Sequence, residues 1–224
     1  MKTIGVLGGM GPEATFVLYQ KIIENTPAKI DQEHIPTIIY SLPQIPDRTA
    51  AALNGGPSPT PLIVQGLKEL EKTPADFVLI PCNTAFYFYK EFAQKTHLPI
   101  LHLPKIVAQH AQKKNAWKRV GVLCTDGTRK TGVYDQALAE FGLDPVYPAA
   151  KDQEKVMTSI YRIKAGEKTA AEFTEIIARL HEGGAEAVIL GCTELSIVAS
   201  LLNAKLPVLD SIEILAKEAV RLAL

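Results

Sequence analysis

The two halves of the chain repeat the same series of short motifs, and this repetition limits the possible folds more than any other feature of the sequence. The first half contains, in order, "KTIGVLGGMGP" (2–12), "ADFVLIPCNT" (75–84) and "LPILHL" (98–103). The second half contains, in the same order, "KRVGVLCTDGT" (118–128), "AEAVILGCTE" (185–194) and "LPVLDS" (206–211). The spacing within the two series is also similar, so we expect two homologous units.

Apolar runs of strand length alternate with longer amphipathic segments in both halves, which predicts an α/β fold. Helices are expected at 12–26, 61–73, 171–184 and 211–224, and a further strand at 35–41. We expect two pseudo-symmetric lobes, each a mostly parallel sheet flanked by helices, with the active site in the cleft between them. The first lobe would comprise residues 1–98 and 210–224, since the C-terminal helix is expected to return to it, and the second would comprise residues 99–209.

Charge and composition argue against several classes of partner. Lysine plus arginine and aspartate plus glutamate both number 24, so no overall basic surface favours nucleic acid or an anionic membrane. No segment approaches about 18 unbroken apolar residues, and the N-terminus lacks the pattern of a signal peptide. Three sparse cysteines predict a reducing cytoplasmic location, and neither they nor the five histidines have the spacing of a metal site.

Cys82 and Cys192 each end an apolar strand at equivalent positions of the two units. Ligands of open parallel sheets bind beyond the carboxyl ends of the strands, so these thiols would approach one cleft from opposite sides. Such a pair suits proton transfer on both faces of one carbon, because a thiolate can remove a proton while a thiol donates one. The N–H groups and side chains of Asn83, Thr84 and Thr193, at the starts of expected helices, would bind a carboxylate and stabilise an enolate-like intermediate.

Other interpretations of the cysteines follow from the same residues. Each could be a small core residue, as free cysteines commonly are, although the symmetric placement argues against this for the pair. A disulfide is disfavoured in the cytosol, and a covalent nucleophile with a histidine base would need a histidine near either motif. Cys124, which falls opposite Gly8 in the repeat, is expected to be structural.

The glycine-rich stretch 5–15 fits a dinucleotide-binding fingerprint only loosely, because Ala14 stands where the last glycine is required. We expect instead a close approach of the backbone to a small ligand, with Met10 as a wall of the pocket. A second carboxylate of the ligand would need a cation. Arg48, Arg162 and Lys164 follow strands of the two lobes and could supply one, although an arbitrary cation is normally a solvated surface residue.

Three of these stretches together resemble the signatures of the aspartate/glutamate racemase family: "GVLGGMGPEAT" (5–15), "PCNTAF" (81–86) and "GCTEL" (191–195). The "GGMGPEAT" form is similar to the aspartate racemase branch, and the resemblance runs from residue 1 to the C-terminus. It implies an isomerase that interconverts L- and D-aspartate, or glutamate, without pyridoxal phosphate or another cofactor. Cys82 and Cys192 match the opposed acid and base, the partner would be a dicarboxylic amino acid, and the protein would be a homodimer.

The resemblance also implies how the substrate backbone is held. Asn83, Thr84 and Thr193 match the groups that bind the α-carboxylate and the amine. Thr125 and Thr128 match a ligand-binding loop of the second lobe.

Further roles concern the substrate side chain and the pocket wall. Met10 matches a residue that lines the pocket, and Arg48 and Lys164 match cations that bind the side-chain carboxylate, which favours aspartate over a neutral amino acid. Glu194 matches an acidic residue beside the second cysteine that orients the amine. Phe86 departs from the family, many of whose members have histidine there; we expect racemisation to survive, with an effect on substrate range or rate.

Alternatives remain on the same scaffold. Hydantoin racemisation, maleate isomerisation through a nucleophilic cysteine and malonate decarboxylation are related reactions, and the two cations argue against a hydantoin. A protein that binds an amino acid without catalysis is the alternative from another class. The presence of both thiols favours an active enzyme.

Overall fold

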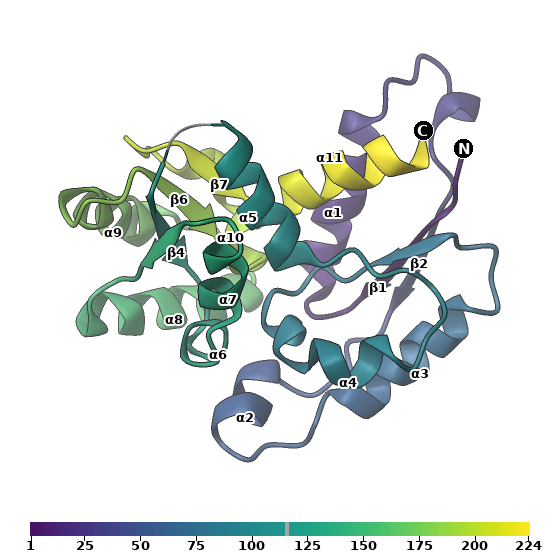
Figure 1. Cartoon of the computed structure of the whole chain (residues 1–224), viewed down its shortest axis with the longest axis horizontal. Helices are drawn as coiled ribbons and strands as arrows, with labels where there is room; N and C mark the ends of the chain where they lie inside the picture. The colour runs from purple at the N-terminus through teal and green to yellow at the C-terminus, as the bar shows by residue number, and fades with distance from the viewer. Residues whose placement is uncertain (115–116) are drawn as a thin grey trace.

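The computed structural model describes residues 1–114 and 117–224, which form two parallel sheets, each flanked by helices (Figure 1). The first sheet has the order β2-β1-β3 and consists of β1 (Ile4–Gly8), β2 (Thr37–Ser41) and β3 (Phe77–Leu79). The second has the order β5-β4-β6-β7 and consists of β4 (Arg119–Leu123), β5 (Asp144–Val146), β6 (Ala187–Leu190) and β7 (Val208–Asp210). The predicted α/β fold with mostly parallel sheets is confirmed.

The register of the two sheets shows how closely the lobes correspond. Gly5 of β1 pairs with Val78 of β3, and Gly121 of β4 pairs with Val188 of β6. On its other side Val78 forms an isolated parallel bridge with Ile100, just as Val188 pairs with Val208 of β7. The strand order is therefore the same in both lobes, and Cys82 and Cys192 lie equally far beyond the paired valines.

Helices connect the strands and cover the sheets. Those between β1 and β4 are α1 (Pro12–Asn25), α2 (Arg48–Leu53), α3 (Thr60–Leu70), α4 (Tyr89–Ala93) and α5 (Leu103–Lys114), with 3-10 turns η1 (Asp31–Glu33) and η2 (Thr84–Phe88). Those after β4 are α6 (Asp126–Lys130), α7 (Val133–Ala139), α8 (Ala150–Lys164), α9 (Ala171–Glu182), α10 (Glu194–Ile197), η3 (Ala199–Leu201) and α11 (Ser211–Ala223). The four helices predicted from the sequence are all present.

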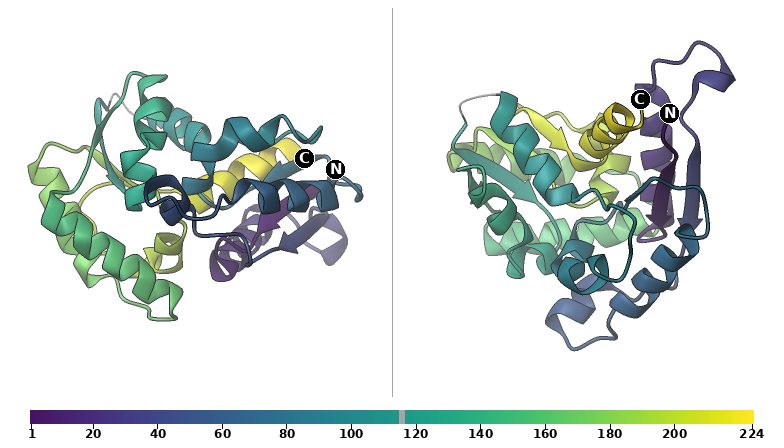
Figure 2. Two further views of the ribbon diagram at one scale, coloured as in Figure 1. Left: turned by 90° about the horizontal axis from the view of Figure 1, so that it is seen from below. Right: turned by 45° about the vertical axis from the view of Figure 1, so that its right-hand side comes forward.

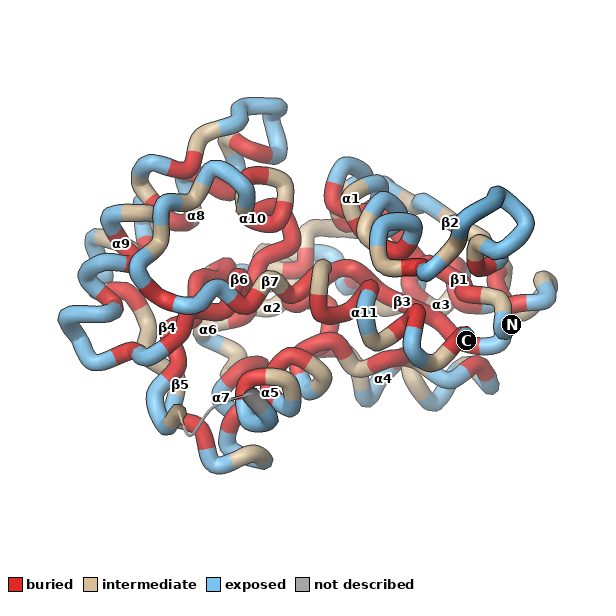
Figure 3. Tube along the Cα trace, turned by 90° about the horizontal axis from the view of Figure 1, so that it is seen from above, coloured by how far each residue is buried: buried red, intermediate tan, exposed pale blue. Residues whose placement is uncertain are grey.

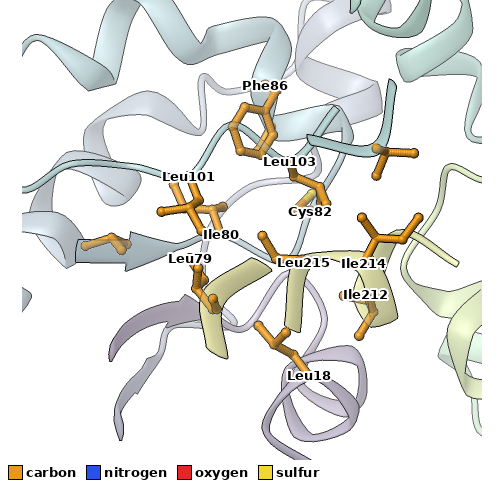
Figure 4. Packing of buried hydrophobic residues seen from close by; sticks show 14 of the residues in the cluster. Leu18, Leu79, Ile80, Cys82, Phe86, Leu101, Leu103, Ile212, Ile214 and Leu215 are labelled. Atoms are coloured by element: carbon orange, nitrogen blue, oxygen red, sulfur yellow. The ribbon is translucent and has the colours of Figure 1, made fainter. Parts of the chain in front are cut away.

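The helix α11 joins the end of the chain to its beginning. It starts directly after β7, where the Asp210 carboxylate accepts a hydrogen bond from Ile212 N over 2.9 Å and caps the helix. From there α11 runs along α1, so that the two termini lie close together (Figures 1 and 2). Leu215 of α11 packs between Leu18 of α1 and the end of β3 (Figure 4). The last helix thus packs against α1, and its expected assignment to the first lobe stays a prediction.

A shared hydrophobic core holds the two lobes together. One cluster of buried residues includes Val6 and Leu79 of the first sheet as well as Val122 and Ile189 of the second, and buried segments run from one lobe into the other (Figure 3). A second cluster lies under α8 and α9 in the second lobe. The continuous core fixes the relative position of the two strand ends on which the cysteines lie. The precise boundary expected at residue 98 stays a prediction.

No helix among residues 1–114 and 117–224 combines the length and the apolar character needed to cross a bilayer.

The glycine-rich loop after β1 is packed tightly against the protein itself. A Cβ on Gly8 would lie 2.3 Å from Thr15 Cγ2, and a Cβ on Gly9 would lie 2.4 Å from the backbone of Leu42. The Gly9 N–H donates to Thr15 Oγ1 over 3.0 Å, which ties the loop to α1. Gly8 and Gly9 are therefore needed because the chain folds back on them. The expected close approach of this loop to a ligand stays a prediction.

Replacing Gly9 by alanine is expected to lower the free energy of unfolding by about 2–4 kcal/mol, because Gly9 has φ +94° and no room for a Cβ. Gly142 is a matched control, since it has φ +69° but open space at its Cβ. Its alanine variant should lose only about 1 kcal/mol, the conformational part. Urea unfolding of both variants measures the difference, and equal losses would contradict the close packing.

Candidate active site

One pocket lies between the lobes, and its walls come from the segments that follow the carboxyl ends of strands in both sheets. Its lining residues are Met10, Asp47, Arg48, Thr49, Cys82, Asn83, Thr84, Thr125, Lys164, Cys192, Thr193 and Glu194. This is the edge at which open parallel sheets bind ligands. All the site residues expected from the sequence contribute to this lining except Thr128.

Cys82 and Cys192 both reach this pocket, from the loops after β3 and β6. Both are free thiols, and each is only 6% exposed, so they are equally buried. Cys82 lies at the border of the hydrophobic core, near Leu103 (Figure 4). Cys124 is completely buried and lies outside the pocket lining, in keeping with the structural role expected for it.

The Cys192 thiol forms a hydrogen bond with a carboxylate. Its Sγ donates a hydrogen bond to Glu194 Oε2 over 2.9 Å, and Glu194 Oε1 lies 3.8 Å from Lys164 Nζ. Burial raises the pKa of the Cys192 thiol well above its usual value, and the negative charge of Glu194 raises it further. The following helix α10 is only one turn long and begins with the carboxylate itself, so its N-terminus does not reverse this effect.

Arg48 is the first residue of α2 and is buried, with 8% of its surface exposed. Its guanidinium donates to the carbonyl oxygens of Ile45, Pro46 and Met10 at 3.1, 2.9 and 3.2 Å, which fixes its position. Burial lowers the pKa of its guanidinium, but the nearby Cys82, Asp47 and Glu194 side chains more than offset this, so the net pKa is raised. Arg48 is thus a desolvated cation beside the first thiol, and its Nε has no partner among the described residues.

Lys164 ends α8 and reaches the pocket from the second lobe. Burial lowers the pKa of its ammonium group, whereas the charges of Glu194 and Cys192 raise it by more, so Lys164 is a cation at neutral pH. Arg162, the other cation of this segment, lies outside the pocket lining and bridges to Glu167 Oε2 at 2.8 Å. Only Arg48 and Lys164 of the three candidate cations therefore line the pocket.

Asn83 is held by side chains from distant parts of the chain. Its Oδ1 accepts from Tyr134 Oη over 2.8 Å, and its Nδ2 donates to Ser211 Oγ over 3.2 Å. Burial raises the pKa of Tyr134, so that its phenol stays neutral and can donate. These two contacts orient the Asn83 amide at the pocket wall and leave one of its N–H groups for a ligand.

Three threonine hydroxyls form a triangle that links the lobes. Thr84 Oγ1 lies 2.9 Å from both Thr125 Oγ1 and Thr128 Oγ1, and the latter two are 3.1 Å apart. Thr125 also caps α6 by accepting from Thr128 N over 3.1 Å. Thr84 and Thr125 line the pocket, whereas Thr128 is completely buried behind them and contacts it only through their hydroxyls.

Phe86, at which the sequence departs from the resembled signature, lies outside the pocket lining. Its ring centroid is 4.7 Å from that of His102, and it lines a separate groove with Tyr89. Burial lowers the pKa of His102 to about 4, so this imidazole is neutral at pH 7. The substitution therefore changes an aromatic cluster behind the Cys82 loop rather than the wall of the pocket.

Four residues of the site were missed in the sequence. Asp47 and Thr49 line the pocket on either side of Arg48, and Asp47 also caps α2 by accepting from Ala50 N over 2.7 Å. The pattern of an aspartate before a short alanine-rich helix was a signal for that cap. Tyr134 and Ser211, by contrast, had no local signal, because they act on Asn83 through contacts made only in the fold.

The site as a whole combines two thiols with equal numbers of positively and negatively charged side chains. Arg48 and Lys164 supply two cations, and Asp47 and Glu194 two carboxylates, around a small space with hydroxyl and amide donors. Such a set can bind a zwitterion with an additional acidic group and place it between two acid–base groups. Among the described residues, no three histidine, cysteine, aspartate or glutamate side chains cluster as a metal site would require.

The chain matches known proteins along nearly its whole length. The model of a family described as Asp/Glu/hydantoin racemase matches residues 7–219. The structure of aspartate racemase from Picrophilus torridus has a TM-score of 0.90 and is 33% identical, the match covering 100% of this chain and 94% of that one.

Two protein sequences add different specificities to the comparison. The broad specificity amino-acid racemase of Bacillus subtilis is 28% identical over 97% of this chain and 96% of its own length. A glutamate racemase from Lysinibacillus sphaericus is 32% identical over 69% of this chain and 60% of its own length. The names of these similar proteins thus agree on the type of reaction and differ in the amino acid.

Proposed function

The chain belongs to the Asp/Glu/hydantoin racemase family, and we propose that it interconverts L- and D-aspartate, with glutamate as a possible second substrate, without a cofactor. The family makes it an amino-acid racemase, an isomerase that acts on a small substrate. The observation that carries the proposal is the pair of equally buried thiols, which lie at equivalent strand ends and line one pocket with the cations Arg48 and Lys164.

In the proposed reaction Cys82 and Cys192 act on opposite faces of the α-carbon. The thiolate of one removes the α-proton, and the thiol of the other donates its proton to the opposite face, which inverts the centre. The donors at the pocket wall, from Asn83, Thr84 and Thr193, hold the α-carboxylate and stabilise the negative charge that develops on it. Thr125 and Thr128 support Thr84 through the hydroxyl triangle.

The proposed preference for aspartate rests on the charges of the site. Arg48 and Lys164 are cations at the pocket wall that suit the side-chain carboxylate, and Arg48 Nε is a buried donor with no partner among the described residues. Glu194 Oε1 is likewise a buried acceptor without a hydrogen bond, and it suits the substrate ammonium. Met10 closes the pocket above Arg48, whose guanidinium its carbonyl oxygen binds.

Proton NMR in D₂O tests this function. L-aspartate and D-aspartate are incubated separately with the protein, without pyridoxal phosphate, and we expect the α-proton signal of each to disappear while the opposite enantiomer appears on a chiral column. Glutamate and alanine, tested in the same way, define the substrate range. Exchange of neither aspartate nor glutamate would contradict the proposal; thermal stabilisation by aspartate without exchange would then indicate a binding protein, and a covalent maleate adduct would indicate a nucleophilic cysteine.

The homodimer and the cytoplasmic location implied by the sequence remain predictions. Gel filtration with light scattering measures the first of these directly.

A further inference from the structure

Tyr134 lies between the two loops that carry the pocket cysteines. It belongs to α7, and it is completely buried. Its hydroxyl donates to Asn83 Oδ1 over 2.8 Å, and Asn83 directly follows Cys82 in the chain. A Cβ placed on Gly191, which directly precedes Cys192, would lie only 2.8 Å from Tyr134 Cε2. The hydroxyl-bearing end of one ring therefore reaches the residues next to both thiols.

On the basis of the racemase function proposed above, we propose that Tyr134 is a positioning residue for the reaction. Its hydroxyl orients the Asn83 amide toward the α-carboxylate of the substrate, and its ring fixes the loop that carries Cys192. Tyr134 itself lies outside the pocket lining, so it acts on the substrate only through these two loops.

The hydroxyl determines which side of the Asn83 amide faces the pocket. A carboxylate only accepts hydrogen bonds, so it requires an N–H group of the amide rather than the amide oxygen. Burial raises the pKa of Tyr134 well above its usual value, so the phenol stays neutral and donates to that oxygen. Ser211 Oγ accepts one N–H group at 3.2 Å, which leaves the other for the substrate. Without the Tyr134 hydroxyl, Asn83 Oδ1 would be buried without this partner, and the amide could turn its oxygen toward the pocket.

The ring holds the loop that precedes Cys192. Gly191 does not have a positive φ, so its lack of a side chain is required by space and not by backbone conformation. Its N–H donates to the carbonyl oxygen of Leu123, the last residue of β4, over 2.7 Å. The Tyr134 ring cannot retreat from Gly191, because it is completely buried and its hydroxyl is bound to Asn83. The loop is thus held between β4 and Tyr134.

A ring that touches both loops also couples them. The ring comes from the second lobe, whereas Asn83 follows a strand of the first, so the hydrogen bond crosses from one lobe to the other. A side chain added at Gly191 must move the phenol, and with it the hydroxyl that holds Asn83. We therefore expect a change beside Cys192 to alter the surroundings of the residue beside Cys82.

The first experiment needs no substrate, so failure of the racemase function and failure of this proposal are distinguishable. In the ¹⁵N-labelled protein, the side-chain amide resonances of Asn83 are identified by their loss in Asn83→Ala. We expect Tyr134→Phe to shift these resonances and to speed exchange of their protons with solvent about tenfold or more. Unchanged resonances in a folded Tyr134→Phe protein would overturn the proposal.

Tyr147→Phe is the matched control. The Tyr147 hydroxyl donates to Asp135 Oδ2 over 2.7 Å, and Asp135 follows Tyr134 in α7. This variant therefore removes a tyrosine hydroxyl bound to the same helix without removing a contact to either cysteine loop. It should leave the Asn83 resonances in place, and an equal shift in both variants would show that any loosening of α7 has the same effect, which would overturn a specific role for Tyr134.

The second experiment adds a methyl group at Gly191. In Gly191→Ala we expect the same Asn83 resonances to shift, because the new Cβ displaces the Tyr134 ring. The methyl group should also lower the urea midpoint of the wild-type protein about twice as much as that of Tyr134→Leu, whose shorter side chain leaves room for it. Unchanged Asn83 resonances in a folded Gly191→Ala protein, or equal losses of stability in the two backgrounds, would overturn the coupling through the ring.

The third experiment is a double-mutant cycle on the racemisation of aspartate. Tyr134→Phe should lower kcat/KM about tenfold or more, mainly through kcat, since the Asn83 amide stabilises charge that develops on the carboxylate. In the Asn83→Ala background the same change should cost less than about twofold, because the hydroxyl then has no amide to orient. Tyr147→Phe should stay within about twofold of the wild type. An equal loss from Tyr134→Phe in both backgrounds would show that its hydroxyl does not act through Asn83, and would overturn the proposal.

Discussion

Serine at either Cys82 or Cys192 is expected to reduce racemisation of aspartate by about 10³-fold or more, since a well-placed acid or base contributes a factor of this size and a serine hydroxyl does not ionise near neutral pH. The two thiols are equally buried and serve one pocket, so neither can take over the face of the other. Chiral chromatography of the reaction with each enantiomer measures the loss.

The two variants should also differ from one another. With one thiol left, the protein can still remove and return a proton on a single face, so each variant should exchange the α-proton of only one enantiomer for deuterium, without inversion. The enantiomer that exchanges in Cys82→Ser should be the one that does not exchange in Cys192→Ser. This complementary pattern assigns each thiol to a face of the substrate.

Cys124→Ala is the control, because Cys124 is equally a free cysteine but lies outside the pocket lining. It should retain activity within about twofold, as expected for a residue with no acid–base role. Inversion that persists in both serine variants would exclude a two-thiol reaction, and loss of inversion in only one of them would point to a different second acid.

The duplication explains why so much of the fold could be predicted. The repeated motifs placed both cysteines after equivalent strands, and the parallel register of Gly5 with Val78 and Gly121 with Val188 follows from the same repeat. The general rule that ligands bind beyond the carboxyl ends of parallel strands then brought both thiols to one pocket. This prediction succeeded because it depended on short local patterns and on a topology with few alternatives.

The parts that could not be predicted depend on contacts between distant segments. The hydroxyl groups of Tyr134 and Ser211 form hydrogen bonds with Asn83, from which they are 51 and 128 residues away in the sequence. No local sequence pattern predicts such contacts. Thr128 is turned behind Thr125 because Thr125 caps α6, which removes it from the pocket wall. The residues after Cys82 form a 3-10 turn and a short helix, so they lack the long helix expected there.

Charge placement was only partly accessible from the sequence. In the sequence, nothing around Arg48 and Lys164 distinguished them from ordinary surface cations. The family resemblance singled them out. The structure shows how they differ from Arg162, which is paired with Glu167 outside the pocket. The hydrogen bond from Cys192 to Glu194 also had no sequence signal, although the two residues are nearly adjacent, because its geometry depends on the tight turn into α10.

Arg48→Ala is expected to lower kcat/KM for aspartate by about 10²- to 10³-fold, which corresponds to the roughly 3–4 kcal/mol typical for losing one partner of a buried charge pair. For asparagine, a neutral amino acid of nearly the same shape, the loss should be at least about tenfold smaller, because its side chain carries no charge for the guanidinium to bind. The ratio of the two losses is therefore the quantity to measure, by α-proton exchange in D₂O.

Two controls make this ratio interpretable. Arg162→Ala removes a cation from the same end of α8 as Lys164, but one that is paired with Glu167 outside the pocket lining, so it should leave turnover of both substrates within about twofold. Urea unfolding of Arg48→Ala measures the separate cost of losing the hydrogen bonds to Ile45, Pro46 and Met10, which affects both substrates alike. Equal losses for aspartate and asparagine in a folded variant would show that Arg48 serves the thiol alone, and the selection of an acidic side chain would then fall to Lys164.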